Sequence, residues 1–276
     1  MIIEIIAERS GTYGGLKRLY RLGEYFQSEG HQVAINLADG SRNTWFQHCI
    51  PENIDIQPSI RIMPETWQRP HPKARNILYV QAEFDPPVDK YDGIITTSKY
   101  LQDKTQEWGY DSVIIPYGIE SNIFTPREDL RQKNLVAYMP RKNLLEAQTV
   151  GMLTDPRQIV YNAIEGLSEP EVAYQYQRSN IFLAVSRVEG FGLPPFEAGL
   201  CGCLVVGYHG WGGAEYLTPE TYVPATSPEE MAYLIQKIIG ADPADYQKIR
   251  SNLRNLILTK LTPCLEWERW KAFLRL

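Results

Sequence analysis

One stretch, residues 186–197, constrains the fold of this chain more than any other. It reads Ser-Arg-Val-Glu-Gly-Phe-Gly-Leu-Pro-Pro-Phe-Glu and follows the apolar run 181–185. A short apolar run is typical of a buried strand. A pair of prolines fits the first turn of a helix, where a missing N–H costs nothing. The stretch therefore predicts a strand-to-helix crossing in an α/β domain.

The same crossing carries residue types that suit a phosphate and sugar hydroxyls. Gly190 and Gly192 let the backbone approach a ligand or take positive φ, and amides at the start of a helix favour an anion. Glu189 lies in the loop, and Glu197 follows about one turn into the helix, where a carboxylate can accept hydrogen bonds from a ribose. These features predict a phosphate flanked by two polyhydroxylated groups. The alternative is an ordinary crossing with no ligand.

From Glu189 to Val206 the sequence resembles the E-x7-E signature of the GT-B-fold retaining glycosyltransferases, in particular the large family 4, the glycosyl transferases group 1. Both acids, both glycines, the proline pair and the following small-residue helix and strand are present. The resemblance implies an α/β fold of the GT-B type. Two Rossmann-like β/α/β domains would face an interdomain cleft, and the C-terminal helix would cross back to the first domain.

The resemblance also implies roles for individual residues. Glu189 would bind hydroxyls of the transferred sugar, and Glu197 the ribose of the nucleotide. Backbone groups would hold the rest of the donor. They lie near the motif, at the end of the strand 158–164, and in two glycine loops at 10–15 and 207–213. The residues concerned are Gly190, Phe191, Gly192, Leu193, Gly212, Gly213, Ile164, Gly14 and Gly15.

A basic pair, Arg141 and Lys142, follows the predicted strand 134–138. Family members carry an arginine and a lysine here, usually several residues apart, which neutralise the donor diphosphate. In this chain the two are adjacent, and neighbouring side chains in an extended segment point in opposite directions. Arg141 is the first choice for this role and Lys142 the second. A solvated pair at a strand end is the alternative.

The first half of the chain begins with a β-loop-α-β unit. A strand at 1–7 is followed by a glycine loop at 10–15, a helical pattern from Leu16 to Phe26 and a strand at 31–37. The loop resembles the first loop of the same family, whose amides approach the donor phosphate or the acceptor. A glycine turn that serves only close packing is the alternative.

The rest of this half is less regular. Residues 39–75 predict a connecting stretch with at most a short strand at 54–57, because prolines interrupt it. Strands follow at 76–80, 93–97 and 112–115, and Ser98 is a predicted N-cap for a helix at 99–108. Gln81 stands where many family members carry a histidine, so no catalytic histidine is assigned. Glu83 and Asp85 are candidates for contact with an acceptor.

Residues 116–119, Pro-Tyr-Gly-Ile, resemble the segment that links the two domains in the same family. The resemblance implies an N-terminal domain at 1–116 on the acceptor side, a donor domain at 117–258 and a crossover helix at 259–276. In the donor domain, Ser168 and Glu171 predict a capping box for a helix that ends near residue 178. Helices are also predicted at 228–239, 243–258 and 265–273. The aromatic stripe of the last one, with Trp267 and Trp270, predicts packing into a core. A membrane-surface role is its alternative.

Composition excludes several classes of protein. A net charge of -5 over 276 residues argues against a general polyanion binder, and hence against nucleic acid as a partner. The four cysteines form no C-x-x-C pair and predict reduced thiols. Neither a signal peptide nor a run of 18 apolar residues is found. We therefore expect a cytoplasmic protein, with peripheral contact to the inner face of the membrane or to a partner protein as an option.

The resulting functional hypothesis is a retaining glycosyltransferase that uses a nucleotide-diphosphate sugar. Because no Asp-x-Asp motif occurs, we expect neither a metal nor a further cofactor. The acceptor, a glycan, a lipid-linked sugar or a small molecule, stays open. One alternative is a sugar-nucleotide epimerase, for which Glu83, Asp85 and His209 are the available acids and bases. The other is a non-catalytic module that binds sugar nucleotides or regulates a transferase.

Overall fold

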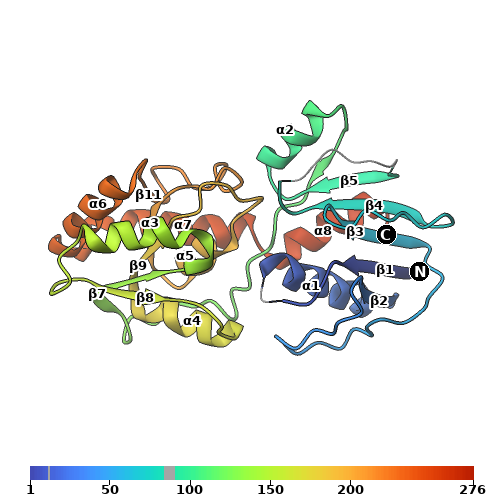
Figure 1. Cartoon of the computed structure of the whole chain (residues 1–276), viewed down its shortest axis with the longest axis horizontal. Coiled ribbons are helices and arrows are strands. Elements are labelled where there is room, and N and C mark those ends of the chain that lie inside the picture. Colours follow the sequence, from blue (N-terminus) through green and yellow to red (C-terminus); the bar gives the residue numbers. More distant parts are fainter. Residues whose placement is uncertain (12, 84–90) are drawn as a thin grey trace. The chain divides into compact units, whose positions relative to one another are not determined.

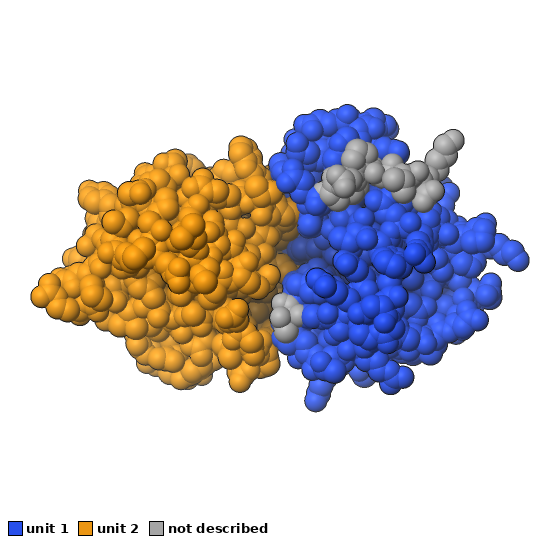
Figure 2. All heavy atoms as spheres, viewed as in Figure 1, with its two compact units in different colours: residues 1–117, 266–276 blue, residues 118–265 orange. Residues whose placement is uncertain are grey.

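The computed structural model describes residues 1–11, 13–83 and 91–276, and the chain divides into two compact units. Unit 1 consists of Met1–Tyr117 together with Glu266–Leu276, and unit 2 is Gly118–Leu265 (Figure 2). Each unit is built on a parallel β-sheet with helices on both faces (Figure 1). The predicted α/β class is confirmed.

Unit 1 contains a parallel sheet in the order β2-β1-β3-β4-β5-β6. Its strands are β1 (Ile2–Ala7), β2 (Gln32–Leu37), β3 (Ile60–Pro64), β4 (Arg75–Val80), β5 (Gly93–Thr96) and β6 (Val113–Ile114). Its helices are α1 (Gly14–Ser28), α2 (Lys99–Glu107) and, from Glu266 on, α8 (Pro263–Leu274). Ser98 caps α2 as predicted, since its side chain accepts a hydrogen bond from the Leu101 N–H.

Strand β3 corrects the prediction for residues 39–75. The expected short strand at 54–57 is absent there, and the strand lies at Ile60–Pro64, between β1 and β4. This strand contains Arg61 and ends at Pro64, so its sequence lacks the continuous apolar run that indicates a buried strand. Arg61 is tolerated because its guanidinium lies 2.7 Å from the buried carboxylate of Glu4, its partner in register on β1. The same pair explains why strand β1 can carry a buried glutamate, Glu4, among its apolar residues.

Aromatic rings connect α1 and α8 across one face of the unit 1 sheet. Trp270 of α8 is fully buried, 5.1 Å from Tyr79 of β4 and 6.2 Å from Phe26 of α1, measured between ring centroids. Trp267 stacks on Tyr25 of α1 with centroids 4.5 Å apart. The predicted core packing of Trp270 is confirmed, and a fully buried ring is not available to a membrane surface.

Unit 2 contains a parallel sheet in the order β11-β10-β9-β7-β8. Its strands are β7 (Gln132–Tyr138), β8 (Val160–Ala163), β9 (Ser179–Ala184), β10 (Leu204–Gly207) and β11 (Val223–Pro224). Its helices are α3 (Pro140–Met152), α4 (Glu169–Arg178), α5 (Leu193–Leu200), α6 (Pro228–Gly240) and α7 (Gln247–Lys260), with a 3-10 turn at Pro243–Tyr246. The capping box of Ser168 and Glu171 is present at the start of α4.

The central strand β9 is buried along its whole length, which explains its continuous apolar sequence. Ile181 and Leu183 join a core formed with α3 and α6, while Phe182 packs against Tyr176 of α4 with ring centroids 5.5 Å apart. Helices therefore cover both faces of the sheet. Because all strands are parallel, the loops that follow β7, β9 and β10 lie along one edge, where ligands bind in such folds.

Candidate functional site

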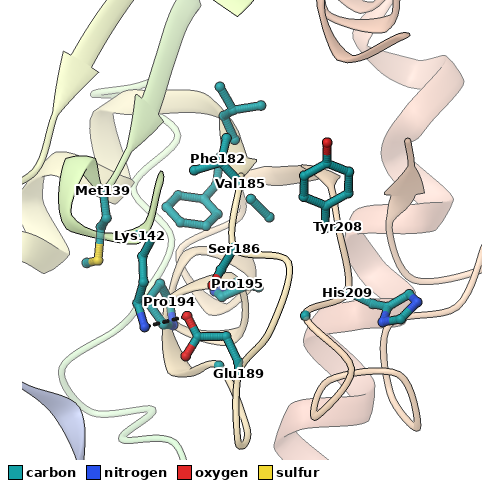
Figure 3. Close-up of a pocket in the computed structure, with 14 residues that line it drawn as sticks. Met139, Lys142, Phe182, Val185, Ser186, Glu189, Pro194, Pro195, Tyr208 and His209 are labelled. Atoms are coloured by element: carbon teal, nitrogen blue, oxygen red, sulfur yellow. Dashed lines mark ion pairs between the residues drawn. The ribbon is translucent and has the colours of Figure 1, made fainter. Parts of the chain in front are cut away.

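A pocket lies at the carboxyl-end edge of the unit 2 sheet (Figure 3). The loops that follow β7, β9 and β10 line it together with the first turn of α5. Its lining includes Met139, Lys142, Val185, Ser186, Glu189, Gly192, Pro194, Pro195, Tyr208, His209 and Gly210. The predicted strand-to-helix crossing therefore forms one wall of a hollow.

Lys142 and Glu189 form an ion pair in this pocket (Figure 3). Their side chains are only 20% and 18% exposed. Burial lowers the pKa of the Lys142 ammonium, and the carboxylate of Glu189 acts in the opposite direction. A cation and an anion thus face the same hollow, and each can exchange its partner for a group of a ligand.

Lys142 owes its position to a helix that sequence reasoning missed. The expected extended segment after residue 138 is wrong, because α3 already begins at Pro140. Asn143 departs from helical geometry, with φ -174° and ψ 84°, and its side chain accepts a hydrogen bond from the Glu146 N–H. It therefore acts as a cap for the longer part of α3. Lys142 precedes this cap and reaches Glu189, whereas Arg141 is exposed and does not line the pocket.

The start of α5 offers fewer amide donors than its glycine-rich sequence indicates. Gly192 precedes the helix with φ 85°, a conformation that glycine adopts without strain. Leu193 opens the helix, but the next two residues, Pro194 and Pro195, carry no N–H. An anion at this helix start would meet the amide of Leu193 and little else from the first turn. Most of the positive charge would then have to come from Lys142.

The loop after β9 and the loop after β10 are joined directly by backbone hydrogen bonds. The Glu189 N–H donates to the Gly210 carbonyl at 2.8 Å, and the Gly212 N–H donates to the Glu189 carbonyl at 3.1 Å. A Cβ atom at Gly212 would lie 2.2 Å from the Gly190 carbonyl oxygen. Gly212 is therefore required for the close approach that fixes the backbone of Glu189.

Replacing Gly212 with alanine should separate these loops. Because the obstacle is backbone and cannot rotate away, we expect the melting temperature to fall by several degrees and ligand binding at the pocket to weaken. Differential scanning fluorimetry measures the first effect. Gly240, at the end of α6, is the matched control, since a Cβ there meets nothing within 4 Å. Equal melting temperatures for Gly212→Ala and Gly240→Ala would contradict the prediction.

Comparison with known proteins identifies this part of the chain. The family model described as "Glycosyl transferases group 1" matches residues 161–256, which include α5 and the loops after β9 and β10. Residues 161–256 are therefore similar to the group 1 glycosyltransferases. An "Alpha-1,6-glucosyltransferase" of Actinobacillus pleuropneumoniae serotype 7 (strain AP76) is 29% identical in an alignment 126 residues long that covers 43% of this chain. The alignment spans only 38% of that relative's length.

Solved structures share the fold over the whole chain. Sucrose-phosphate synthase from Thermosynechococcus elongatus matches with a TM-score of 0.78 and 15% identity, over 99% of this chain and 98% of that one. Anabaena HepE, solved in complex with UDP and glucose, matches with a TM-score of 0.75 and 13% identity, over 100% of both chains. The fold is that of the GT-B glycosyltransferases, as expected from the motif.

The group 1 signature residues do not all face the pocket. Glu189 and Gly192 line it, whereas Glu197 is buried in α5 with 6% exposure. Phe191 packs between Phe196 and Tyr216 with ring centroids 5.0 and 6.0 Å away, so its side chain belongs to the core. Further predicted positions are also buried in unit 2: Gly190, Leu193, Ile164, Gly212 and Gly213.

A polar cluster of Arg187, Glu146 and Tyr208, which the sequence did not indicate, lies beside the loop after β9. The Arg187 guanidinium donates to Glu146 of α3 at 2.6 Å and to the Tyr208 hydroxyl at 2.8 Å. It therefore ties the loop after β9 both to α3 and to the loop after β10. With the helix mispredicted, nothing in the sequence indicated that Glu146 would reach the loop. His209, considered as an acid or base, accepts a hydrogen bond from the Trp211 N–H at 3.0 Å.

The remaining candidates lie in unit 1. Gly14 and Gly15 open α1, and the Gln81 side chain donates to the Gly15 carbonyl at 3.3 Å. Glu83 accepts a hydrogen bond from the Tyr100 hydroxyl at 2.8 Å, and Asp85 lies outside the described residues.

In the part of the chain that the structure covers, no helix is long and apolar enough to cross a membrane.

Glu65, just after β3, is a buried carboxyl that sequence reasoning did not single out. It is 8% exposed, and its oxygen accepts the Gln81 N–H at 3.0 Å. Burial raises its pKa from 4.5 to about 7. The folded state therefore holds a proton between pH 4.5 and 7 that the unfolded state has lost.

The free energy of unfolding should accordingly decrease as the pH rises through this window. The Glu65 contribution is at most about 3.5 kcal/mol, since one pKa unit corresponds to about 1.4 kcal/mol. Glu65→Gln, which cannot ionise, should flatten the dependence and be more stable than the parent at pH 8. Urea unfolding at pH 5, 6, 7 and 8 measures both curves. Parallel curves would show that Glu65 does not titrate in this range.

Proposed function

We propose that this chain transfers a sugar from a nucleotide-diphosphate sugar to an acceptor, with retention of the anomeric configuration. The observation that carries the proposal is the Lys142–Glu189 pair in a pocket at the carboxyl-end edge of the sheet in unit 2. A sugar diphosphate carries both the anion and the hydroxyls that such a pair can bind separately. Retention rests on the resemblance to family 4.

In this proposal the donor separates the ion pair of Lys142 and Glu189. The diphosphate takes over the Lys142 ammonium, helped by the Leu193 amide, and the Glu189 carboxylate accepts hydrogen bonds from sugar hydroxyls. Negative charge grows on the leaving diphosphate in the transition state, so a cation held there lowers the barrier. Arg141 provides a second, more exposed charge, and Glu197 is the proposed partner of the ribose.

UDP-glucose is the first donor to test. HepE was solved with UDP and glucose, and the curated relative is named as a glucosyltransferase. We propose that the reaction needs no metal, a proposal supported by the missing Asp-x-Asp motif and by the lysine at the diphosphate position. The acceptor is a glycan, a lipid-linked sugar or a small molecule, and we place the reaction in the cytoplasm.

A donor panel tests the proposal. The purified chain is incubated with UDP-, GDP- and ADP-linked sugars, with and without candidate acceptors and with EDTA or Mg²⁺. We expect one donor to release its nucleoside diphosphate, and the transferred sugar to keep its anomeric configuration by NMR. Isomerised donor without release would indicate an epimerase. Tight binding without turnover would indicate a non-catalytic module.

A further inference from the structure

Trp211 is an exposed aromatic residue in the loop after β10, a loop that contributes to the candidate site. Its side chain is 55% exposed, although tryptophan is among the residues that gain most from burial. It follows directly on His209 and Gly210, both of which line the pocket. A large apolar side chain is therefore exposed to solvent on a residue whose backbone pairs with that of Glu189.

The backbone holds Trp211 in an unfavourable conformation. Its φ is 58°, which lies in the left-handed region that residues other than glycine rarely adopt. The conformation is maintained by the pairing of Trp211 with Glu189 in an isolated parallel bridge and by the bond from the Gly212 N–H to the Glu189 carbonyl. Glycine would fit here without strain, and glycines stand on both sides. Backbone strain that the surroundings maintain is concentrated at functional sites.

The indole is also restrained by a neighbouring ring. His209 packs against it almost at a right angle, 81° between planes, with ring centroids 5.4 Å apart. The backbone N–H of Trp211 donates to Nδ1 of the same histidine at 3.0 Å, which holds the imidazole in place. The contact between the two rings therefore limits the movement of the indole.

The surroundings of Trp211 indicate what kind of molecule would cover it. An aromatic face suits the C–H groups of a ring, while the carboxylate of Glu189 and the ammonium of Lys142 suit hydroxyl and phosphate groups. A pyranose combines an apolar face with a rim of hydroxyls. A lipid chain would require a continuous apolar surface, and Trp211 is flanked instead by glycines and by the polar His209.

We propose that Trp211 is the platform on which a pyranose ring of the substrate stacks. The proposal rests on the proposed function, since it assumes that the pocket receives a sugar. The ring can belong to the donor or to a sugar acceptor, and these two sources predict different measurements.

Three variants test the platform. Trp211→Gly removes the indole and fits the positive φ, so it should keep the melting temperature of the parent. Trp211→Phe keeps an aromatic face. Tyr233→Ala, which removes a 63% exposed ring on α6 away from the pocket lining, is the control.

Four quantities are measured: the Kd of UDP, the Kd of UDP-glucose, the KM of the acceptor and kcat. If the donor panel identifies another nucleotide sugar as the substrate, that sugar and its nucleoside diphosphate replace UDP-glucose and UDP. Loss of an aromatic contact corresponds to roughly a 3- to 10-fold weakening. If the donor sugar stacks, Trp211→Gly raises only the Kd of the nucleotide sugar. If an acceptor sugar stacks on the indole, Trp211→Gly raises only the KM of the acceptor. In both cases kcat changes little, and Trp211→Phe recovers most of the loss.

Three results would overturn the proposal. The first is a Trp211→Gly variant whose constants all stay within about twofold of the parent, as in Tyr233→Ala. The second is an equal weakening for UDP and UDP-glucose, which would show that the indole supports the loop rather than a sugar. The third is a parent protein that neither binds nor turns over any panel donor, which would remove the proposed function as well. The first two leave the proposed function intact.

Discussion

Glu189→Gln should lower kcat/KM for sugar transfer by about 100-fold or more, the size of effect seen when a group that stabilises transition-state charge is lost. Glutamine keeps the shape of the side chain, and the loop pairing uses only the backbone of residue 189. The variant removes the negative charge and replaces one of the two acceptor oxygens for sugar hydroxyls by an NH2 group that can only donate. It also removes the carboxylate that raises the pKa of Lys142, so the pKa of this buried ammonium should fall further.

Initial rates of nucleoside diphosphate release measure this effect. Glu229→Gln, which neutralises an exposed carboxylate on α6, is the matched control and should retain the activity of the parent. The melting temperature of Glu189→Gln should lie within a few degrees of the parent value. A variant with full transfer activity would exclude Glu189 from the reaction.

The largest loss of stability is expected from Glu266→Ala. Glu266 of α8 pairs with Arg18 of α1, and both side chains are 1% exposed. Removal of one partner leaves a buried charge uncompensated, which costs about 3–5 kcal/mol. The Arg18 guanidinium also lies over the rings of Tyr117 and Trp267, at 5.6 and 5.7 Å, so it has no path to water without disturbing this packing.

Urea unfolding followed by tryptophan fluorescence measures the loss. The double variant Arg18→Met/Glu266→Leu is the sharpest comparison, because an apolar pair of similar size avoids the buried charge and should recover most of the stability. Lys104→Ala breaks a surface pair with Glu107 and should leave the melting temperature unchanged. If Glu266→Ala behaved like Lys104→Ala, the buried pair would contribute nothing to unit 1.

Local patterns predicted a large part of the fold. The apolar run of β9, the prolines of α5 and the capping box of α4 each specify a structure within a few residues, and all three are present. Strand β3 was misplaced because its neighbours supply what its sequence lacks. Arg61 is acceptable only because Glu4 lies opposite it in the sheet.

The contacts within the candidate site were harder to predict. Lys142 and Glu189 were both named, but their ion pair depends on a helix start at Pro140 and a cap at Asn143. A proline after a strand and an asparagine three residues later suit a loop equally well. The burial of Glu65 and the exposure of Trp211 depend on which loops meet at a sheet edge, and a single sequence does not carry that information.

The two parts of unit 1 give this chain an unusual order of folding. Domains usually fold during synthesis from the N-terminus onward. Here unit 2 is one continuous segment, while unit 1 needs residues 266–276 to cover Phe26 and Tyr79 with Trp270 and to neutralise Arg18 with Glu266. On the ribosome, unit 1 is synthesised first, but its core stays incomplete until α8 emerges. Unit 2 is synthesised later and can complete its core before unit 1 does.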